Sequence, residues 1–286
     1  MIKSIEINAN TVTAWEKYHK SLYPQRIGRG ADFYDLDREN SADEGFGRLR
    51  FKMPGHRPEL EKFFEYALGR DIKVFNSKGD VDYEGYIHSM TMNTGIHMLR
   101  KSMQHIFNKV WARFDASEGI DPTQRSTVFE DAASQARFGV IEKVMGGGQQ
   151  ADLSAMDTAV RNRLTLFAWP MVDPDLDAGS GDPYIQLTCS GYLNTLGWRT
   201  YNQTGDTGDT DLSVVAAAVV AACGDFIATS SISTNVIQVP QEYDVDRFAH
   251  DILISLAAMG DSAGNRWLAR MRKDRNFYLG PAARVR

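Results

Sequence analysis

A glycine-rich turn around a serine, residues 260–264, carries the residue types of a nucleophilic site. Such a turn can leave backbone N–H groups free to form an oxyanion hole beside the serine hydroxyl. A catalytic serine also needs a histidine base that an acid orients. The nearest pair, His250 and Asp251, lies on a predicted helix about a dozen residues before Ser262. We therefore expect a structural turn, which Gly, Asp and Ser favour, and no catalysis by Ser262.

Other side chains could hold a metal ion, but their spacing argues against it. The histidines fall on different predicted elements and form no HxxxH or similar motif: His56, His88, His97 and His105. The two cysteines, Cys189 and Cys223, lie far apart, so neither a zinc site nor a disulfide is indicated. The acidic run Asp206, Asp209 and Asp211 lacks the glutamate that closes a calcium-binding EF-hand loop. We expect surface or half-buried histidines and a solvated acidic loop.

The glycine run at residues 146–150 lacks the Lys and Ser/Thr of a phosphate-binding loop. We interpret it as a flexible connector. No catalytic, metal-binding or cofactor-binding residue is indicated anywhere in the chain. The sequence thus predicts a protein that is not an enzyme and uses no cofactor.

Aromatic residues near the ends of predicted elements are the remaining signal, and most of them are expected in the core. Trp and Tyr also anchor subunit interfaces, because they bury a large area and keep a polar group for hydrogen bonding. We take Trp111 and Trp267 as candidate interface residues. We expect the chain to turn at Gly191 and to pack Tyr192 and Trp198 against the core of the second domain.

The composition is that of an ordinary globular protein, with 43% hydrophobic and 24% charged residues in 286. The net charge of -5 and the scattered basic residues do not suggest a nucleic-acid partner. The N-terminus has no signal-peptide pattern. The longest apolar stretch, residues 214–223, is about half of the ~20 residues needed to span a membrane, so no membrane insertion is expected.

The spacing of apolar residues predicts an α+β fold that is mainly β. The predicted strands are residues 5–9, 49–53, 72–75, 81–92, 108–114 and 184–189, with further strands in 226–239 and a C-terminal hairpin at 266–279. The predicted helices are residues 60–68, 129–138, 154–167, 211–223 and 244–259. A polar segment at 115–125 marks a junction between two domains, residues 1–115 and 116–286.

Residues 25–47 show no sustained period and are rich in Gly, Asp and Arg, which predicts a long loop or arm. A structureless segment of this length is usually functional or disordered. We expect it to reach a neighbouring subunit, where Phe33, Tyr34 and Leu36 supply buried contact and the mixed charges fix the register. The alternative is a solvated loop.

Several short segments, read in order, resemble the hub and minor tail proteins of tailed bacteriophages. The matching segments are 83–87 (Tyr-Glu-Gly-Tyr-Ile), 102–103, 108–114 (Asn-Lys-Val-Trp-Ala-Arg-Phe), 134–139, 159–170, 189–201 (Cys-Ser-Gly-Tyr through Trp-Arg-Thr-Tyr) and 260–267. Together they span roughly residues 49–279. The arm at 25–47 has no counterpart in the resemblance.

This resemblance implies a β-barrel-like N-terminal hub domain with a packed helix, in a structural subunit of the virion tail. It implies a ring, commonly a trimer, around the tail axis at the distal end of the tail tube, in the hub or baseplate region. The implied partners are other copies of this chain and the tail tube, distal tail and tape measure proteins. Nucleic acid would be met at most transiently, as the genome passes, and assembly would take place in the host cytoplasm.

Other interpretations remain open at this point. The chain could be another virion part, such as a distal-tail ring, a tail completion protein or a fibre adaptor. A hydrolase that acts as the phage enters the cell is an alternative of a different class, and a host-derived binding module is another. Gene neighbourhood would separate these alternatives fastest.

Overall fold

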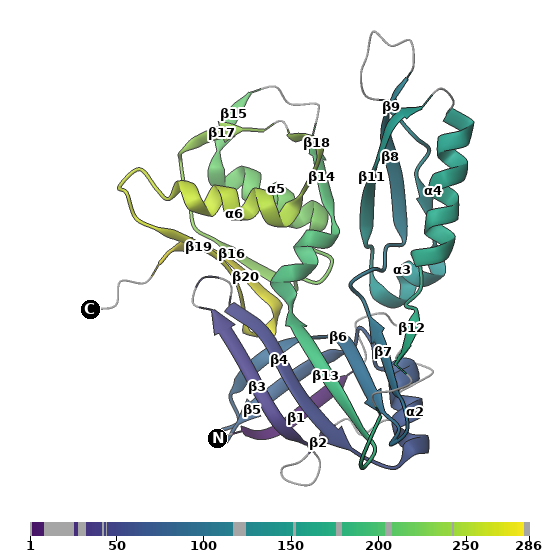
Figure 1. Cartoon of the computed structure of the whole chain (residues 1–286). Coiled ribbons are helices and arrows are strands. Elements are labelled where there is room, and N and C mark those ends of the chain that lie inside the picture. Colours follow the sequence, from purple (N-terminus) through teal and green to yellow (C-terminus); the bar gives the residue numbers. More distant parts are fainter. Residues whose placement is uncertain are drawn as a thin grey trace.

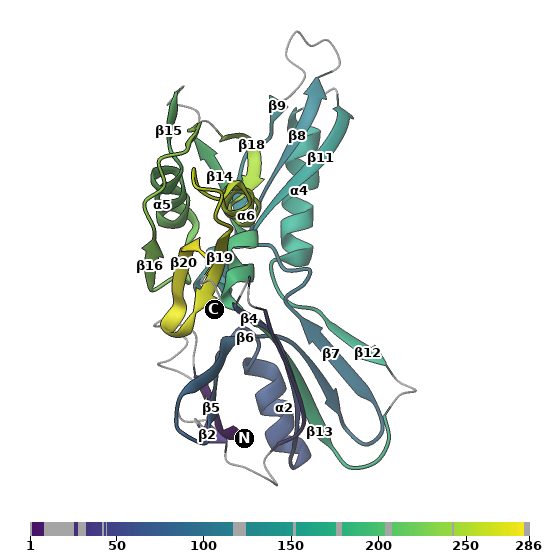
Figure 2. The same ribbon diagram turned by 90° about the vertical axis from the view of Figure 1, so that its left-hand side faces the viewer.

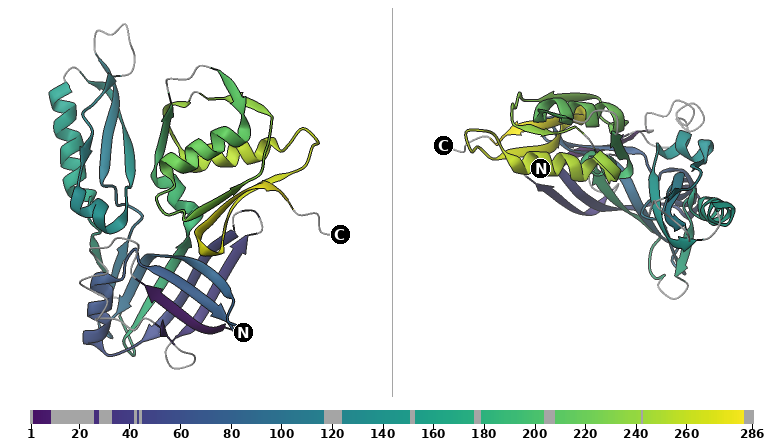
Figure 3. Two further views of the ribbon diagram at one scale, coloured as in Figure 1. Left: turned by 180° about the vertical axis from the view of Figure 1, so that it is seen from behind. Right: turned by 90° about the horizontal axis from the view of Figure 1, so that it is seen from above.

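The computed structural model describes residues 2–8, 26–27, 33–41, 43, 45–116, 124–150, 153–175, 179–203, 208–241 and 243–282. A long curled sheet forms the base of the molecule, and two lobes rise from it side by side (Figure 1). Figure 2 shows the same arrangement from the side, and Figure 3 from behind and from above. The predicted fold class, α+β and mainly β with a curled, barrel-like N-terminal sheet, is confirmed.

The large sheet has twelve strands, and its main path runs β16-β20-β19-β4-β13-β6-β5-β1-β2. β3 pairs with β4, and β7 joins β6 to β12. The strands are β1 (Ile2–Asn8), β2 (Arg26–Ile27), β3 (Tyr34–Ser41), β4 (Gly45–Pro54), β5 (Asp71–Asn76), β6 (Val81–Asn93), β7 (Met98–Ser102), β12 (Val172–Asp175), β13 (Tyr184–Gly191), β16 (Thr229–Ile232), β19 (Trp267–Arg272) and β20 (Asn276–Pro281).

Alternation of apolar and polar residues builds the base of the molecule. In β4, Leu49, Phe51 and Met53 are buried while the residues between them face outward, as the two-residue period of a strand requires. Helix α2 (Arg57–Tyr66) packs against β6 and β13 through Leu60, Phe63 and Phe64. These three residues recur at helical spacing, so they form one apolar face.

The first lobe, called here the β8–β11 lobe, is a small sheet covered by a helix. It contains β8 (Lys109–Ala116), β9 (Gln124–Arg125), β10 (Phe129–Glu130), α3 (Ala132–Phe138), β11 (Glu142–Gln150) and α4 (Leu153–Phe167). β11 pairs with β8 in parallel, and α4 packs on one face of both. Val110, Ala112 and Phe114 of β8 form a core with this helix.

The second lobe, called the α5–α6 lobe, packs two helices against short strands. It contains the 3₁₀ helix η1 (Tyr192–Trp198), β14 (Thr200–Gln203), β15 (Asp209–Asp211), α5 (Leu212–Cys223), β17 (Gln238–Pro240), β18 (Tyr243–Phe248), α6 (Ala249–Met259) and the 3₁₀ turn η2 (Lys273–Arg275). Its strands β16, β19 and β20 continue the large sheet, which links the lobe to the base.

The proposed junction at residues 115–125 stays a prediction, and part of it, 117–123, lies outside the described residues. The two halves of the chain nevertheless share one sheet. β13, from the second half, lies between β4 and β6 of the first half. The base is therefore completed by a strand that is distant in sequence.

Several local predictions are wrong because strand pairing overrode the local pattern. Residues 34–41 of the predicted arm form β3 and pair with β4, so this part is not a loop. Residues 244–248, predicted as the start of a helix, belong to β18 (Tyr243–Phe248), and 129–130 form β10 ahead of α3. The glycine run at 146–150 is the end of β11 and not a free connector. Asp209 and Asp211 lie in β15, while Asp206 is outside the described residues.

Two facing glycines allow the end of β13 to lie close to its neighbours. Gly191 is opposite Gly85 of β6 in the strand register. A Cβ atom on Gly191 would lie 1.7 Å from the carbonyl oxygen of Phe46, and one on Gly85 would lie 2.3 Å from that of Ser190. The chain can therefore leave the sheet and enter η1 only with a hydrogen as the side chain here.

The turn after Gly191 brings aromatic rings together, as the sequence predicts. Tyr192 is buried and its ring lies 5.8 Å from that of Tyr86 and 6.2 Å from that of Phe226. Trp198 is partly buried between Tyr86 and Phe226, at 5.2 and 5.4 Å. This aromatic junction joins the base to the α5–α6 lobe.

We predict that Gly191→Ala lowers the free energy of unfolding by about 3 kcal/mol, the upper range for overpacking, because the backbone of Phe46 cannot move freely. The control is Gly146→Ala, since no atom lies within 4 Å of its Cβ position. Urea denaturation of both variants measures the difference. Equal stability of the two variants would contradict the close approach.

Candidate interaction surfaces

A buried carboxylate joins the two lobes. Asp246 of β18 accepts hydrogen bonds from Nε1 of Trp111 (3.2 Å), Nε of Arg113 (2.5 Å) and Nδ2 of Asn202 (2.6 Å). Trp111 and Arg113 lie on the face of β8 opposite α4, because side chains alternate along a strand. Burial alone would raise the pKa of Asp246, but the hydrogen bonds from Arg113, Asn202 and Trp111 outweigh it and lower the pKa.

A second buried carboxylate lies beside the first contact. Glu142, at the start of β11, accepts hydrogen bonds from N and Oγ1 of Thr200, at 2.6 and 2.9 Å. Its carboxylate also lies 3.4 Å from Nζ of Lys109 and 3.6 Å from Nε of Arg199. The two lobes thus meet through polar groups whose partners are specific, which fixes their relative orientation.

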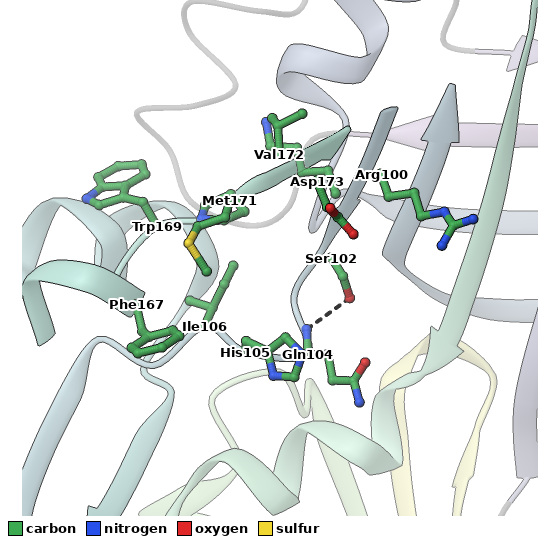
Figure 4. A pocket seen from close by; sticks show the side chains of 12 residues that line it. Arg100, Ser102, Gln104, His105, Ile106, Phe167, Trp169, Met171, Val172 and Asp173 are labelled. Atoms are coloured by element: carbon green, nitrogen blue, oxygen red, sulfur yellow. Dashed lines mark hydrogen bonds between the residues drawn. The ribbon is translucent and has the colours of Figure 1, made fainter. Parts of the chain in front are cut away.

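An exposed apolar surface follows the end of α4, between α3, β7 and β12. Trp169 is 40% exposed, Met171 59% and Val172 49%. They line a pocket of about 480 Å³ together with Phe167, Ile106 and His105. Figure 4 shows Trp169 and Met171 on one side of this pocket and Arg100, Ser102 and Gln104 on the other. Clustered exposed apolar side chains of this kind mark interaction sites.

Cations flank this surface. Arg137 stacks on Phe138 and Trp169, with its guanidinium carbon 5.0 and 6.0 Å from the ring centres. Arg137 and Lys101 both donate to the carbonyl oxygen of Glu65, at 3.2 and 3.0 Å. Burial, with a further contribution from Arg137, lowers the pKa of Lys101 to about 8.

A larger cleft of about 740 Å³ adjoins this pocket and runs between the lobes. The two share Gln104, His105, Ile106 and Phe167, so they lie on either side of one short segment. Trp198 and Phe248 of the α5–α6 lobe line the cleft from one side and Arg163 of α4 from the other. Residues 141–146, at the start of β11, also line it.

The structure places the candidate interface residues in two different environments. Trp111 is 1% exposed and Trp267 4%, with Nε1 of Trp267 bonded to Asp261 at 3.2 Å. Both are core residues, and neither has surface to offer a neighbour in this conformation. Phe33 and Leu36 are partly buried against the chain's own core, whereas Tyr34 is 40% exposed.

Three of the four charged side chains of β3, those of Asp35, Asp37 and Arg38, form ion pairs within the chain. Arg38 pairs with Asp82, and Asp35 accepts from Nζ of Lys52 at 2.8 Å. Those charges are thus engaged inside the subunit. The use of residues 25–47 at an interface stays a prediction, and parts of that segment lie outside the described residues.

Trp169 is one of the aromatic residues that the sequence points to, but it was not chosen as an interface candidate, and Met171 and Val172 were missed. Their signal was the apolar run Phe-Ala-Trp-Pro-Met-Val directly after a helix, where polar residues are expected. The partners of Asp246 lie 44 to 135 positions away in the chain, and no local pattern indicates them.

The serine turn at 260–264 is organised by its aspartate. One carboxylate oxygen of Asp261 accepts from the backbone N of Ala263 and Asn265, at 3.0 and 2.9 Å. Side-chain and backbone hydrogen bonds from Asn265 lower the pKa of Asp261 to about 2. The carboxylate therefore serves to hold the turn together.

Among the described residues, no group of three or more His, Cys, Asp or Glu side chains is arranged to hold a metal ion. No helix in the described part of the chain is both long enough and apolar enough to cross a membrane.

Comparison with known proteins gives one structural neighbour to report. No protein-family model matches the sequence. No curated protein sequence matches it either. A 43 kDa tail protein of prophage MuSo2 from Shewanella oneidensis, known from its crystal structure, is similar with a TM-score of 0.28 and 12% identity. The alignment covers 72% of this chain and 52% of that protein, so the chain spans about half of its length.

We predict that Asp246→Ala costs about 3 kcal/mol, because it leaves the buried Trp111 indole and the partly buried Arg113 guanidinium without their shared acceptor. The control is Asp175→Ala, which breaks an exposed ion pair with Arg100 and should cost under about 1 kcal/mol. Urea denaturation compares the two. Because the pKa of Asp246 is lowered on folding, its stabilisation is complete above its ordinary value of 3.8 and is lost as pH falls through the lowered value. A cost of Asp246→Ala that does not shrink in this acidic range would contradict the role of its charge.

We also predict that Ser262→Ala leaves both the thermal midpoint and any measured hydrolysis unchanged. Asp261→Ala should lower the midpoint, because the turn loses the five hydrogen bonds that Ala263, Asn265 and Trp267 donate to this carboxylate. Labelling of Ser262 by a serine-directed covalent probe would overturn this assignment.

Proposed function

We propose that this chain is a structural, non-enzymatic subunit of the tail of a tailed bacteriophage, from the hub or baseplate region at the distal end of the tail tube. The proposal starts from the short segments that resemble hub and minor tail proteins. One observation supports it above all. The segments that resemble those proteins are separate in the sequence, but they contact each other in the folded chain.

The first such contact is the aromatic junction. Tyr86, from the segment 83–87, packs on Tyr192 and Trp198, from the segment 189–201. Ser190 lies opposite Tyr86 in the register of β13 with β6. Strand β19, which begins at Trp267 from the last matching segment, contacts η1.

The second contact is centred on Asn108, which is buried in the segment 108–114. Its Nδ2 donates to Oγ of Ser134 at 3.2 Å and to the carbonyl of Gly139 at 2.8 Å, both in the segment 134–139. Residues of α4 in the segment 159–170 pack against β8. The segments that carry the resemblance are therefore the ones that hold the architecture together, as expected for a shared fold.

In this function the subunits form a ring, with a trimer as the stoichiometry that the resemblance implies. Cyclic symmetry would bury one surface of each subunit against a different surface of the next. The exposed side chains of Trp169, Met171 and Val172 are suited to such a contact, since aromatic and Met residues are enriched at interface centres. Neighbouring tail proteins would cover the remaining faces.

Immunogold electron microscopy of purified particles tests the location. Antibodies against this chain are expected to label the distal end of the tail. Label on the head or along the tail shaft would contradict the hub position, and particles without any label would contradict a role in the virion. Particles from a strain that lacks the gene provide the control for antibody specificity.

A further inference from the structure

Two long strands have a partner on one side only among the described strands: β3 pairs with β4, and β11 pairs with β8. A free edge exposes N–H and C=O groups that can pair with another chain, and charged side chains normally protect it. β3 has charged residues at four of its eight positions. β11 has Glu142 and Lys143 at its start, and its last seven residues, Val-Met-Gly-Gly-Gly-Gln-Gln, are uncharged. β11 is therefore a long edge with little protection.

The free edge of β11 faces the cleft between the lobes. Six consecutive residues, 141–146, line that cleft. Side chains of a strand point alternately to its two faces, so a cavity that contacts only one face is lined by every second residue. A cavity lined by consecutive residues therefore lies along the edge of the strand. In Figure 1, β11 runs along the side of its lobe that faces β14 and β18.

The ladder with β8 shows which backbone groups point into the cleft. The N–H of Lys109 donates to the carbonyl of Ile141 at 3.1 Å, so Ile141 directs its groups toward β8. In a parallel pair this direction alternates from residue to residue, which gives Lys143 and Met145 the same direction. The N–H and C=O groups of Val144 and Gly146 consequently point to the free edge.

The cleft is lined by apolar side chains on one face of β11 and by cationic side chains on the other. Val144 is paired with Trp111 in the register, so its side chain lies on the face toward Trp198 and Phe248. The opposite face carries Lys143 and, from α4, Arg163. A strand added here would therefore meet apolar groups on one side and cations on the other.

These cations lack acidic partners within the described part of the chain. No ion pair is formed there by Lys143 or by Arg163, whose guanidinium stacks on Phe167 at 5.3 Å. The acid that lines the cleft, Glu142, is buried and bound to Thr200, Lys109 and Arg199. The charge of the cleft thus complements an acidic occupant.

We propose that β11 is a strand-addition site for an extended segment of a partner protein in which acidic and apolar residues alternate. Main-chain hydrogen bonds to Val144 and Gly146 would supply affinity, and the alternating side chains would supply specificity. The acidic side chains meet Lys143 and Arg163, and the apolar ones meet Trp198 and Phe248. The inference does not depend on the phage-tail function.

The test uses the full chain and a fluorescent eight-residue peptide that alternates valine with glutamate. Fluorescence anisotropy is expected to show saturable binding, weakened at least tenfold when lysine replaces glutamate in the peptide. Lys143→Glu with Arg163→Glu should reverse this preference. Failure of the glutamate peptide to bind at millimolar concentration, or equal binding of both peptides, would overturn the proposal.

Val144→Pro removes the N–H that points to the cleft and leaves the bonds to β8 in place. Val144→Ala is the matched control, because it shortens the side chain and keeps the N–H. We expect at least a tenfold loss of peptide affinity for the proline variant relative to the alanine variant. Equal affinities would show that the peptide docks through side chains alone, against strand addition.

A second measurement covers the case in which Val144→Pro disturbs folding. In the unaltered chain, the peptide should slow hydrogen exchange at the amides of Val144 and Gly146. Unchanged exchange at these amides with peptide bound would overturn the proposal. Sedimentation of the chain alone tests whether a second copy of this chain occupies the edge of β11. Self-association that is lost in Val144→Pro and kept in Val144→Ala would contradict the proposal of an acidic partner.

Discussion

The position of β13 between β4 and β6 is the constraint on which the rest of the molecule depends. Leu187 is opposite Phe51 on one side and Met90 on the other, and all three are buried. These pairings join residues about a hundred or more positions apart, so closing the chain between them costs conformational entropy before any contact is gained. The apolar interior of the base offsets that cost.

The strands of this sheet lead into both lobes and so determine where each lobe lies. β13 leads directly into η1 through Gly191, and the aromatic contacts of Tyr192 and Trp198 then set how the α5–α6 lobe sits on the base. The β8–β11 lobe follows β7 and returns to it through β12. A change in the register of β13 would therefore displace elements far from the sheet.

The lobes meet through charged and hydrogen-bonded groups more than through apolar ones. Asp246 and Glu142 each gather partners from both lobes while being almost fully buried. Removing such charged groups from water is costly, so these contacts add less to the net stability than their close geometry suggests. The cleft beside β11 adjoins this contact, because Glu142 also lines the cleft.

Sequence alone determined the elements whose burial follows a local period. The alternation in β4, the hairpin of β5 and β6, the helices α2, α4 and α5, and the C-terminal hairpin of β19 and β20 all lie close to their predicted ranges. The turn at residues 260–264 also lies where it was predicted, because Gly, Asp and Ser favour turns through their own backbone and side-chain geometry.

Tertiary structure decided what depends on partners distant in the chain. Residues 34–41 and 243–248 have weak local patterns and became strands because β4 and β14 offer them hydrogen bonds. Trp111 and Trp267 were expected at an interface, and they lie buried within the chain, where Asp246 and Asp261 accept their indole N–H groups. A glycine run has no side-chain pattern that could indicate a strand, so β11 is a strand because it pairs with β8. Its free edge lines a cleft because the α5–α6 lobe lies opposite it. The local sequence reports which face of an element is apolar, whereas the fold determines which residues meet across space.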